Sequence, residues 1–236
     1  MANRRRQLST VAIVFLALLA PAAALIGGLA FDTERITNYW TSVEVRNGQT
    51  NIVEVIDYDF GSSSRRGIFR TIPGFDPTTE VAVSSATAPV PTQISLGQTA
   101  TVRIGDPATT IRGRHRYRID YDLRTLIQDD QLWWNAVGTD WDVSIGNAEI
   151  HILSDRELLE PRCDSGLRGS FGGCSVKQIE PGHLLVETGR LSAREGVTVL
   201  AGLGAELGAA PSIAIPPNRP LNSGLSVIVP MVIAFL

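Results

Sequence analysis

Polar and apolar side chains alternate with a period of two through much of the middle of the chain. Residues 39–45 and 52–60 both follow this alternation, which is typical of half-buried β-strands. Asn47-Gly48 separates the two stretches, and this dipeptide favours the positive φ angles of a two-residue hairpin turn. The sequence therefore predicts an antiparallel β-hairpin over residues 39–60.

Further short segments of strand character follow, each bounded by Gly, Pro, Asp or Ser. They cover residues 80–84, 99–104, 114–121, 146–153, 183–187 and 197–200. Helical periodicity is scarce, and residues 122–131 and 155–160 are the only segments that could hold short helical turns. Many short strands with regular turn signals predict a mainly β fold, either an antiparallel β-sandwich or an open barrel.

The pattern changes at the N-terminus, where an apolar run covers residues 11–30. Arg4, Arg5 and Arg6 precede this run. Basic residues before an apolar segment are typical of a cleaved signal peptide or of a retained membrane anchor, and the run is about as long as a membrane span. Residues 1–31 are therefore expected to export the rest of the chain, by either route.

The C-terminus is apolar as well, over residues 221–236. A helix needs about 20 residues to cross a bilayer, so this run is expected to be the start of a truncated transmembrane helix. The alternative is a buried strand of the domain. Residues 211–220 are rich in proline and are expected to form a linker, which leaves residues 32–210 as one extracytoplasmic β-domain.

Charge limits the partners of this domain. The chain has 24 acidic and 21 basic residues, and three of the basic ones precede the first apolar run, so the exported part is acidic. Nucleic-acid binding requires clustered positive charge, and no nucleic acid is expected as a partner. No phosphate-binding glycine loop or other cofactor motif is present in the sequence, and no cofactor is expected.

Cys163 and Cys174 are the only two cysteines, and they flank a segment rich in Gly and Ser. Two cysteines in an exported chain are most simply a disulfide. A metal site is disfavoured because no histidine or further cysteine stands at ligand spacing.

Two stretches together resemble a known family. The first is 67–73, Gly-Ile-Phe-Arg-Thr-Ile-Pro, and the second runs from 117–121, Tyr-Arg-Ile-Asp-Tyr, through 130–138, Asp-Gln-Leu-Trp-Trp-Asn-Ala-Val-Gly, to Trp141. In this order they resemble the N-terminal extracytoplasmic domain of the bacterial predicted membrane proteins called domain of unknown function 2207. The resemblance covers about residues 34–153. It implies an exported β-domain followed by transmembrane helices, and it implies no activity.

The segment 129–142 holds three tryptophans and four aspartates. The candidate site residues here are Trp133, Trp134, Asp130 and Asp140, because indole faces stack on sugars and carboxylates accept hydrogen bonds from sugar hydroxyls. The alternative is structural, with large aromatic side chains filling one end of a sandwich. Adjacent tryptophans on a strand point to opposite faces, so Trp133 and Trp134 are not expected to line one flat site.

Four arginines alternate along the predicted strand near residue 114. Arg112, Arg114, Arg116 and Arg118 fall on one face, where they would bind lipid head groups or an anionic cell-envelope polymer. The alternative is that the arginines pair with carboxylates of a neighbouring strand. The candidate partners are Glu44, Glu54, Asp57 and Asp59.

These observations lead to a membrane-tethered binding or interaction module on the extracytoplasmic side of a bacterial cell membrane. A protein partner is also compatible with them. Enzymatic activity is not expected, because no nucleophile elbow or zinc-protease motif occurs in the sequence. Two alternatives remain: a cell-envelope carbohydrate-binding or hydrolytic enzyme that uses residues 129–142, and a structural subunit of a membrane complex.

Overall fold

The computed structural model describes residues 33–75, 79–96 and 99–218. All regular structure within these residues is β, as predicted, and none of their segments is a helix long and apolar enough to span a membrane. The predicted terminal segments, residues 1–31 and 221–236, lie outside the described residues.

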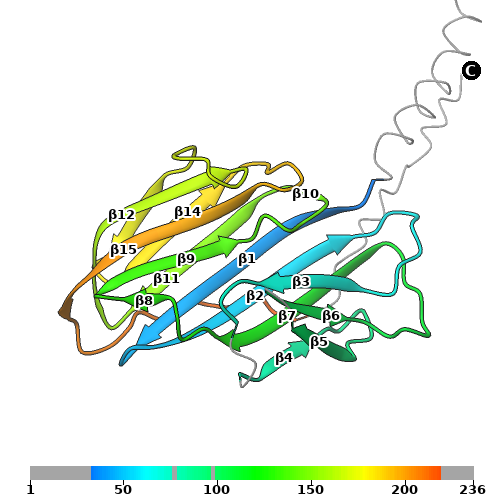
Figure 1. Ribbon diagram of the computed structural model, residues 1–236, viewed down its shortest axis with the longest axis horizontal. Coiled ribbons are helices and arrows are strands. Elements are labelled where there is room, and N and C mark those ends of the chain that lie inside the picture. The colour runs from blue at the N-terminus through cyan, green and yellow to red at the C-terminus, as the bar shows by residue number, and fades with distance from the viewer. Residues whose placement is uncertain (1–32, 76–78, 97–98, 219–236) are drawn as a thin grey trace, which may run out of the picture.

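One large sheet forms the base of the domain (Figure 1). Its strand order is β13 (Val176–Glu180), β14 (His183–Thr188), β11 (Ala148–Ser154), β1 (Arg35–Arg46), β2 (Gln49–Asp59), β7 (Arg114–Asp122) and β4 (Val81–Ser84), with β10 (Ser144–Ile145) pairing to β1.

Two smaller sheets pack side by side against one face of the large sheet (Figure 1). The four-stranded sheet has the order β12 (Arg156–Gly166), β15 (Gly196–Glu206), β9 (Gln131–Val137) and β8 (Ile127–Gln128). The three-stranded sheet has the order β3 (Ile68–Ile72), β6 (Ala100–Ile104) and β5 (Thr92–Leu96). Buried side chains from all three sheets form one continuous core.

The predicted hairpin is present as β1 and β2, which pair in antiparallel register from Arg46 with Gln49 to Arg35 with Asp59. Asn47 and Gly48 both have positive φ angles, 49° and 73°, as a tight hairpin turn requires. The alternation of residues along β2 places Ile52, Glu54 and Ile56 on the core side.

Two features of the backbone differ from the predictions. Strand β1 pairs in parallel with β11, so the large sheet is mixed rather than purely antiparallel. Residues 122–131 and 155–160, the two segments that could have held short helical turns, contain β8 and the start of β12 instead. Leu158 of β12 pairs with Leu203 of β15 and is buried, so sheet pairing outweighs the local sequence there.

A buried ion pair joins the three-stranded sheet to the large sheet. Arg70 of β3 and Glu54 of β2 are 2% and 0% exposed, and their Nη2 and Oε1 atoms are 2.7 Å apart. The Tyr121 hydroxyl donates to the same carboxylate at 2.6 Å. Burial is the largest influence on the pKa of Arg70 and lowers it, but the Glu54 charge, the nearby Tyr39 and Tyr121 and the hydrogen bond to Glu54 together raise that pKa well above its ordinary value. The guanidinium also lies 5.9 Å from the ring of Trp141. Arg70, Tyr121 and Trp141 belong to the motifs that resemble the family, and the three residues therefore meet in the core.

The residues after β15 cross the outer face of the large sheet. We call residues 207–218 the C-terminal strap. Ile213 packs on Trp40, Val53 and Val55, which form a small apolar cluster on that face. The strap contains most of the proline-rich segment that the sequence suggests as a linker, and within the described residues that segment lies against the domain.

The end of the strap is held by hydrogen bonds. The Pro217 carbonyl accepts one from Arg116 at 3.1 Å. The Asn218 side chain donates to Ser84 at 3.1 Å and accepts from the Ala86 backbone N–H at 3.2 Å. These contacts place residue 218 beside β7 and β4, at the end of the large sheet where β1 begins (Figure 1).

Candidate functional site

Strand β9 carries the two adjacent tryptophans of the predicted site, and they point in opposite directions. Trp134 is 1% exposed and belongs to the core, whereas Trp133 is 67% exposed. The strand alternates regularly, with Leu132, Trp134 and Ala136 buried. The expectation that the two rings cannot share one flat site therefore holds, and Trp133 is the one that solvent or a ligand can reach.

Trp133 lies on the outward surface of the four-stranded sheet, which we call the Trp133 face. The register of β9, β15 and β12 defines its members, which lie side by side across the three strands. They are Gln131, Trp133, Asn135, Thr198, Leu200, Gly202, Leu159, Arg162 and Asp164. Gly202 has no side chain, and the only apolar members besides the indole are Leu159, which is 45% exposed, and Leu200.

A hollow of about 530 Å³ adjoins the Trp133 face. Asn135, Thr198 and Asp164 belong both to the face and to the lining of the hollow. The loop 166–170 and Asp140 complete much of the wall. Asn135 is only two residues from Trp133 on the same side of β9, so the indole stands at the edge of the hollow.

The loop beside the hollow is fastened at both ends. Cys163 and Cys174 lie at disulfide-bonding distance, with their Cα atoms 5.8 Å apart. The Gly172 backbone N–H donates to Asp164 Oδ1 at 2.6 Å. These contacts hold the loop close to β12, so the hollow is part of the folded domain.

The two candidate aspartates of the segment are separated. Asp140 lines the hollow that adjoins the Trp133 face. Asp130 lies in the turn before β9, at the other end of the strand, where it pairs with Arg156 at 2.6 Å. The structure therefore places Asp140 in the wall of the hollow, which Asn135 joins to the Trp133 face, and leaves Asp130 and Trp134 outside this site.

The arginines of the predicted stripe have partners. Arg114 pairs with Asp59 at 3.3 Å and Arg116 with Asp57 at 2.5 Å, both across strands, and Arg118 pairs with Asp120 of its own strand at 2.7 Å. These pairs correspond to the cross-strand alternative for the first two arginines. Hydrogen bonding to Asp57 and Asp120, respectively, raises the pKa of Arg116 and of Arg118.

The other members of that prediction lie elsewhere. Arg112 precedes β7 in an exposed loop, where its Nε donates to the Ser64 hydroxyl at 2.7 Å. Glu54 faces the core and binds Arg70, and Glu44 pairs with Arg46 at 2.5 Å. The four arginines therefore do not form a stripe of free charges.

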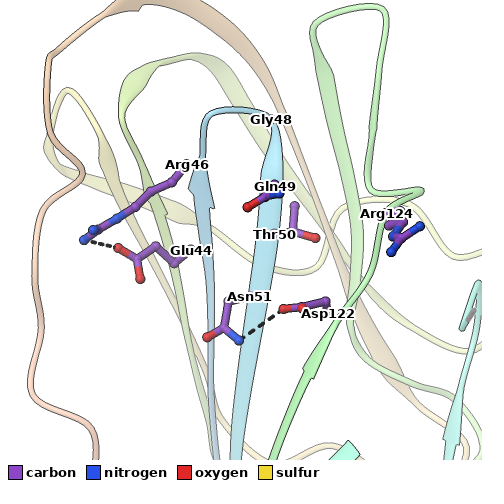
Figure 2. Close-up of a pocket in the computed structure, with 8 residues that line it drawn as sticks. All are labelled: Glu44, Arg46, Gly48, Gln49, Thr50, Asn51, Asp122 and Arg124. Carbon is purple, nitrogen blue, oxygen red and sulfur yellow. Dashed lines mark hydrogen bonds and ion pairs between the residues drawn. The ribbon is translucent and has the colours of Figure 1, made fainter. Parts of the chain in front are cut away.

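A second hollow of about 530 Å³ lies at the tip of the β1–β2 hairpin (Figure 2). Four of its polar side chains bind one another in two pairs: Arg46 pairs with Glu44, and the Asn51 amide donates to Asp122 at 3.2 Å. None of the aromatic or cysteine candidates from the sequence lines this hollow. We therefore place the candidate site at the Trp133 face.

Sequence reasoning missed Arg162, Asp164, Thr198 and Asn135 as members of this face. The signal that could find the first two is the alternation along β12, but a β-bulge interrupts it between Leu159 and Arg162. No cluster of three or more metal-ligating side chains occurs in the described ranges.

Comparison with models of known protein families gives one match. Residues 35–203 match the model of the family described as predicted membrane protein (DUF2207), N-terminal domain, which confirms the resemblance seen in the sequence. No curated protein matches the chain.

Solved structures give only a distant likeness. An M1 zinc metallopeptidase from Deinococcus radiodurans is 12% identical, with a TM-score of 0.40, and a two-domain M1 zinc metallopeptidase mutant bound to L-arginine is 10% identical, with the same TM-score. Each match covers 70% of this chain, and the chain spans 42% of the length of either enzyme. A likeness at this level does not indicate a shared activity.

Proposed function

We propose a binding function for this chain, which belongs to the DUF2207 family of predicted membrane proteins. In this proposal the β-domain is a membrane-tethered module on the extracytoplasmic side of a bacterial cell membrane. It binds carbohydrate chains of the cell envelope at the Trp133 face, without chemical conversion.

The observation that carries the proposal is the exposure of Trp133 beside a polar hollow. A tryptophan that is 67% exposed leaves most of a large apolar ring in water, and covering that ring with a ligand is favourable. Sugar rings present flat apolar faces with hydroxyls at their rims. The indole matches the faces, and Asn135, Thr198 and Asp140 of the hollow match the hydroxyls.

Binding is preferred over hydrolysis because one of the two carboxylates that line the hollow already has a structural role, whereas glycoside hydrolysis generally uses a pair of carboxyl groups. Asp164, one of its two carboxylates, accepts the hydrogen bond that holds the adjacent loop. The arginine stripe supports lipid or polymer binding less well, since Arg114, Arg116 and Arg118 already have carboxylate partners.

A binding assay with a matched aromatic control tests the proposal. The full chain is placed in phosphatidylcholine nanodiscs and titrated with soluble oligosaccharides released from bacterial cell envelopes. Trp133→Ala is expected to weaken binding at least tenfold, because it removes the stacking platform. Phe69→Ala is the control, since Phe69 is similarly exposed, at 63%, on the outer side of the three-stranded sheet.

The control is expected to change the dissociation constant by less than twofold. Equal binding by wild type and Trp133→Ala would overturn the proposal. Shortened oligosaccharides in the wild-type sample would instead favour the hydrolase alternative, and the absence of any oligosaccharide binding would favour a structural subunit of a membrane complex.

A further inference from the structure

The charges on the Trp133 face indicate which class of glycan it would bind. Arg162 of β12 is in register with Leu200 of β15, and Leu200 is in register with Trp133 of β9. All three side chains point outward, and two strand spacings separate the arginine from the tryptophan by roughly 10 Å. The guanidinium and the indole are therefore neighbours on one surface, with the half-buried side chain of Leu200 between them.

Arg162 differs from the arginines of the large sheet because no carboxylate of the described residues pairs with it. Within the described part of the chain, neither Arg162 nor the nearby Arg168 makes an ion pair or a side-chain hydrogen bond. Both are exposed, and Arg168 lines the hollow. By contrast, Arg114, Arg116 and Arg118 each bind a carboxylate.

The surroundings of these two arginines are mixed in charge. Asp140 and Asp164 line the same hollow as Arg168, so a ligand with negative charge all along its length would be repelled there. Arg162, however, lies on the open part of the face, next to Leu200 and one row from Asp164. This arrangement fits a glycan with a single anionic group near a stacked sugar ring and with hydroxyls toward the aspartates.

We infer that the Trp133 face recognises an anionic glycan, with one sugar ring stacked on Trp133 and a carboxylate or phosphate of a neighbouring sugar held by Arg162. This inference rests on the proposed function. A guanidinium binds either anionic group through two parallel hydrogen bonds, which a neutral sugar cannot replace. Arg168 supplies a second positive charge at the edge of the hollow.

The test compares three oligosaccharides of equal length: a neutral one, one that carries a single uronate carboxylate, and one that carries a single phosphate. The full chain is held in phosphatidylcholine nanodiscs, which add no net lipid charge. Wild type is expected to bind at least one anionic oligosaccharide about tenfold more tightly than the neutral one. This preference is expected to shrink in high salt, because the arginine is exposed.

Arg162→Gln is expected to reduce the preference to less than twofold, because it removes the positive charge that holds the anionic group. Arg66→Gln is the matched control, because Arg66 is exposed in the loop before β3, on another sheet. It is expected to retain the full preference. Comparison of the carboxylate and phosphate arms identifies the anionic group.

The outcomes separate this inference from the proposed function. If wild type binds neutral and anionic oligosaccharides equally and Trp133→Ala abolishes both, the inference is overturned and the proposed function stands. A preference that survives in Arg162→Gln also overturns it. If no oligosaccharide binds to wild type, both the inference and the proposed function fail.

Discussion

The outer face of the large sheet and the outer face of the four-stranded sheet each carry a tryptophan, with opposite surroundings. Trp40 on the large sheet is 7% exposed and packs with Val53 and Val55 beneath Ile213 of the strap. Its Nε1 donates to Glu149 at 3.1 Å. Trp133 on the smaller sheet is 67% exposed.

The two tryptophans show that apolar surface on the outside of a sheet is covered in one place and exposed in the other. One such surface is covered by the chain's own C-terminal strap, and its arginines are paired with carboxylates. The other is left open, and within the described residues it keeps Arg162 without a partner. An exposed aromatic beside an unpaired charge contributes little to folding, so the open face is where selection for binding would act.

The largest expected effect comes from truncating each tryptophan in turn. Trp40→Ala is expected to lower the free energy of unfolding by about 3 to 5 kcal/mol, because it leaves a cavity beneath the strap and removes one of the two contacts to Glu149 Oε1. Trp133→Ala is expected to change it by less than about 0.5 kcal/mol. Urea unfolding of both variants measures this, and similar losses would contradict the comparison.

A smaller effect is expected from loosening the strap. Ile213→Asp places a charge against the Trp40 cluster and is expected to cost about 1 to 2 kcal/mol of unfolding free energy. It should also expose Trp40 to a dye that binds apolar surface. Ile215→Asp is the control, since Ile215 is an exposed residue of the same strap, and equal effects of the two changes would argue against a specific contact at Ile213.

The smallest expected effect is a dependence on pH confined to the covered face. His151 and His183 lie there with ring nitrogens 2.9 Å apart, and His151 also contacts Glu149 at 2.8 Å. Burial, followed by the charge of His151, lowers the pKa of His183, and Glu180 opposes the shift. Near the ordinary histidine pKa of about 6.5, His183 is therefore protonated in the unfolded chain but still neutral in the folded one. The free energy of unfolding consequently falls as the pH drops below that value.

Urea midpoints at pH 7.5 and pH 5.5 measure this loss, and His183→Gln is expected to reduce it. None of the three histidines lies on the four-stranded sheet, so the Trp133→Ala variant should retain the wild-type pH dependence. A pH dependence that is unchanged in His183→Gln would place the titrating group elsewhere.

Local patterns in the sequence predict much of the fold. Asn47-Gly48 and the alternation on either side specify the first hairpin, because both signals act over a few residues. The parallel pairing of β1 with β11 joins residues about 110 positions apart, and no local pattern encodes it. The position of the strap against the large sheet could not be predicted from the sequence either. A proline-rich segment has the same composition whether it is a free linker or an extended segment packed on a sheet.

The site shows the same limits. Alternation on a strand predicts that Trp133 and Trp134 face opposite sides, but only the packing of the sheets decides which one is buried. The burial of Glu54 was predictable from the sequence, because Glu54 alternates with Ile52 and Ile56 and so lies on the same side of the strand as they do. Arg162 could not be placed, because the bulge before it shifts the face on which it lies.

The strap also determines how the domain would carry mechanical load. Arg116 binds both Pro217 of the strap and Asp57 of β2, while Arg35, near the start of the described chain, binds Asp59 two residues further along β2. A pull between residues 34 and 218 therefore enters and leaves at one end of the molecule. The contacts nearest to these two points are the side-chain bonds of Arg35 and Arg116 and the pairing of the start of β1 with β2 and β10, whereas the Arg70–Glu54 pair lies in the core.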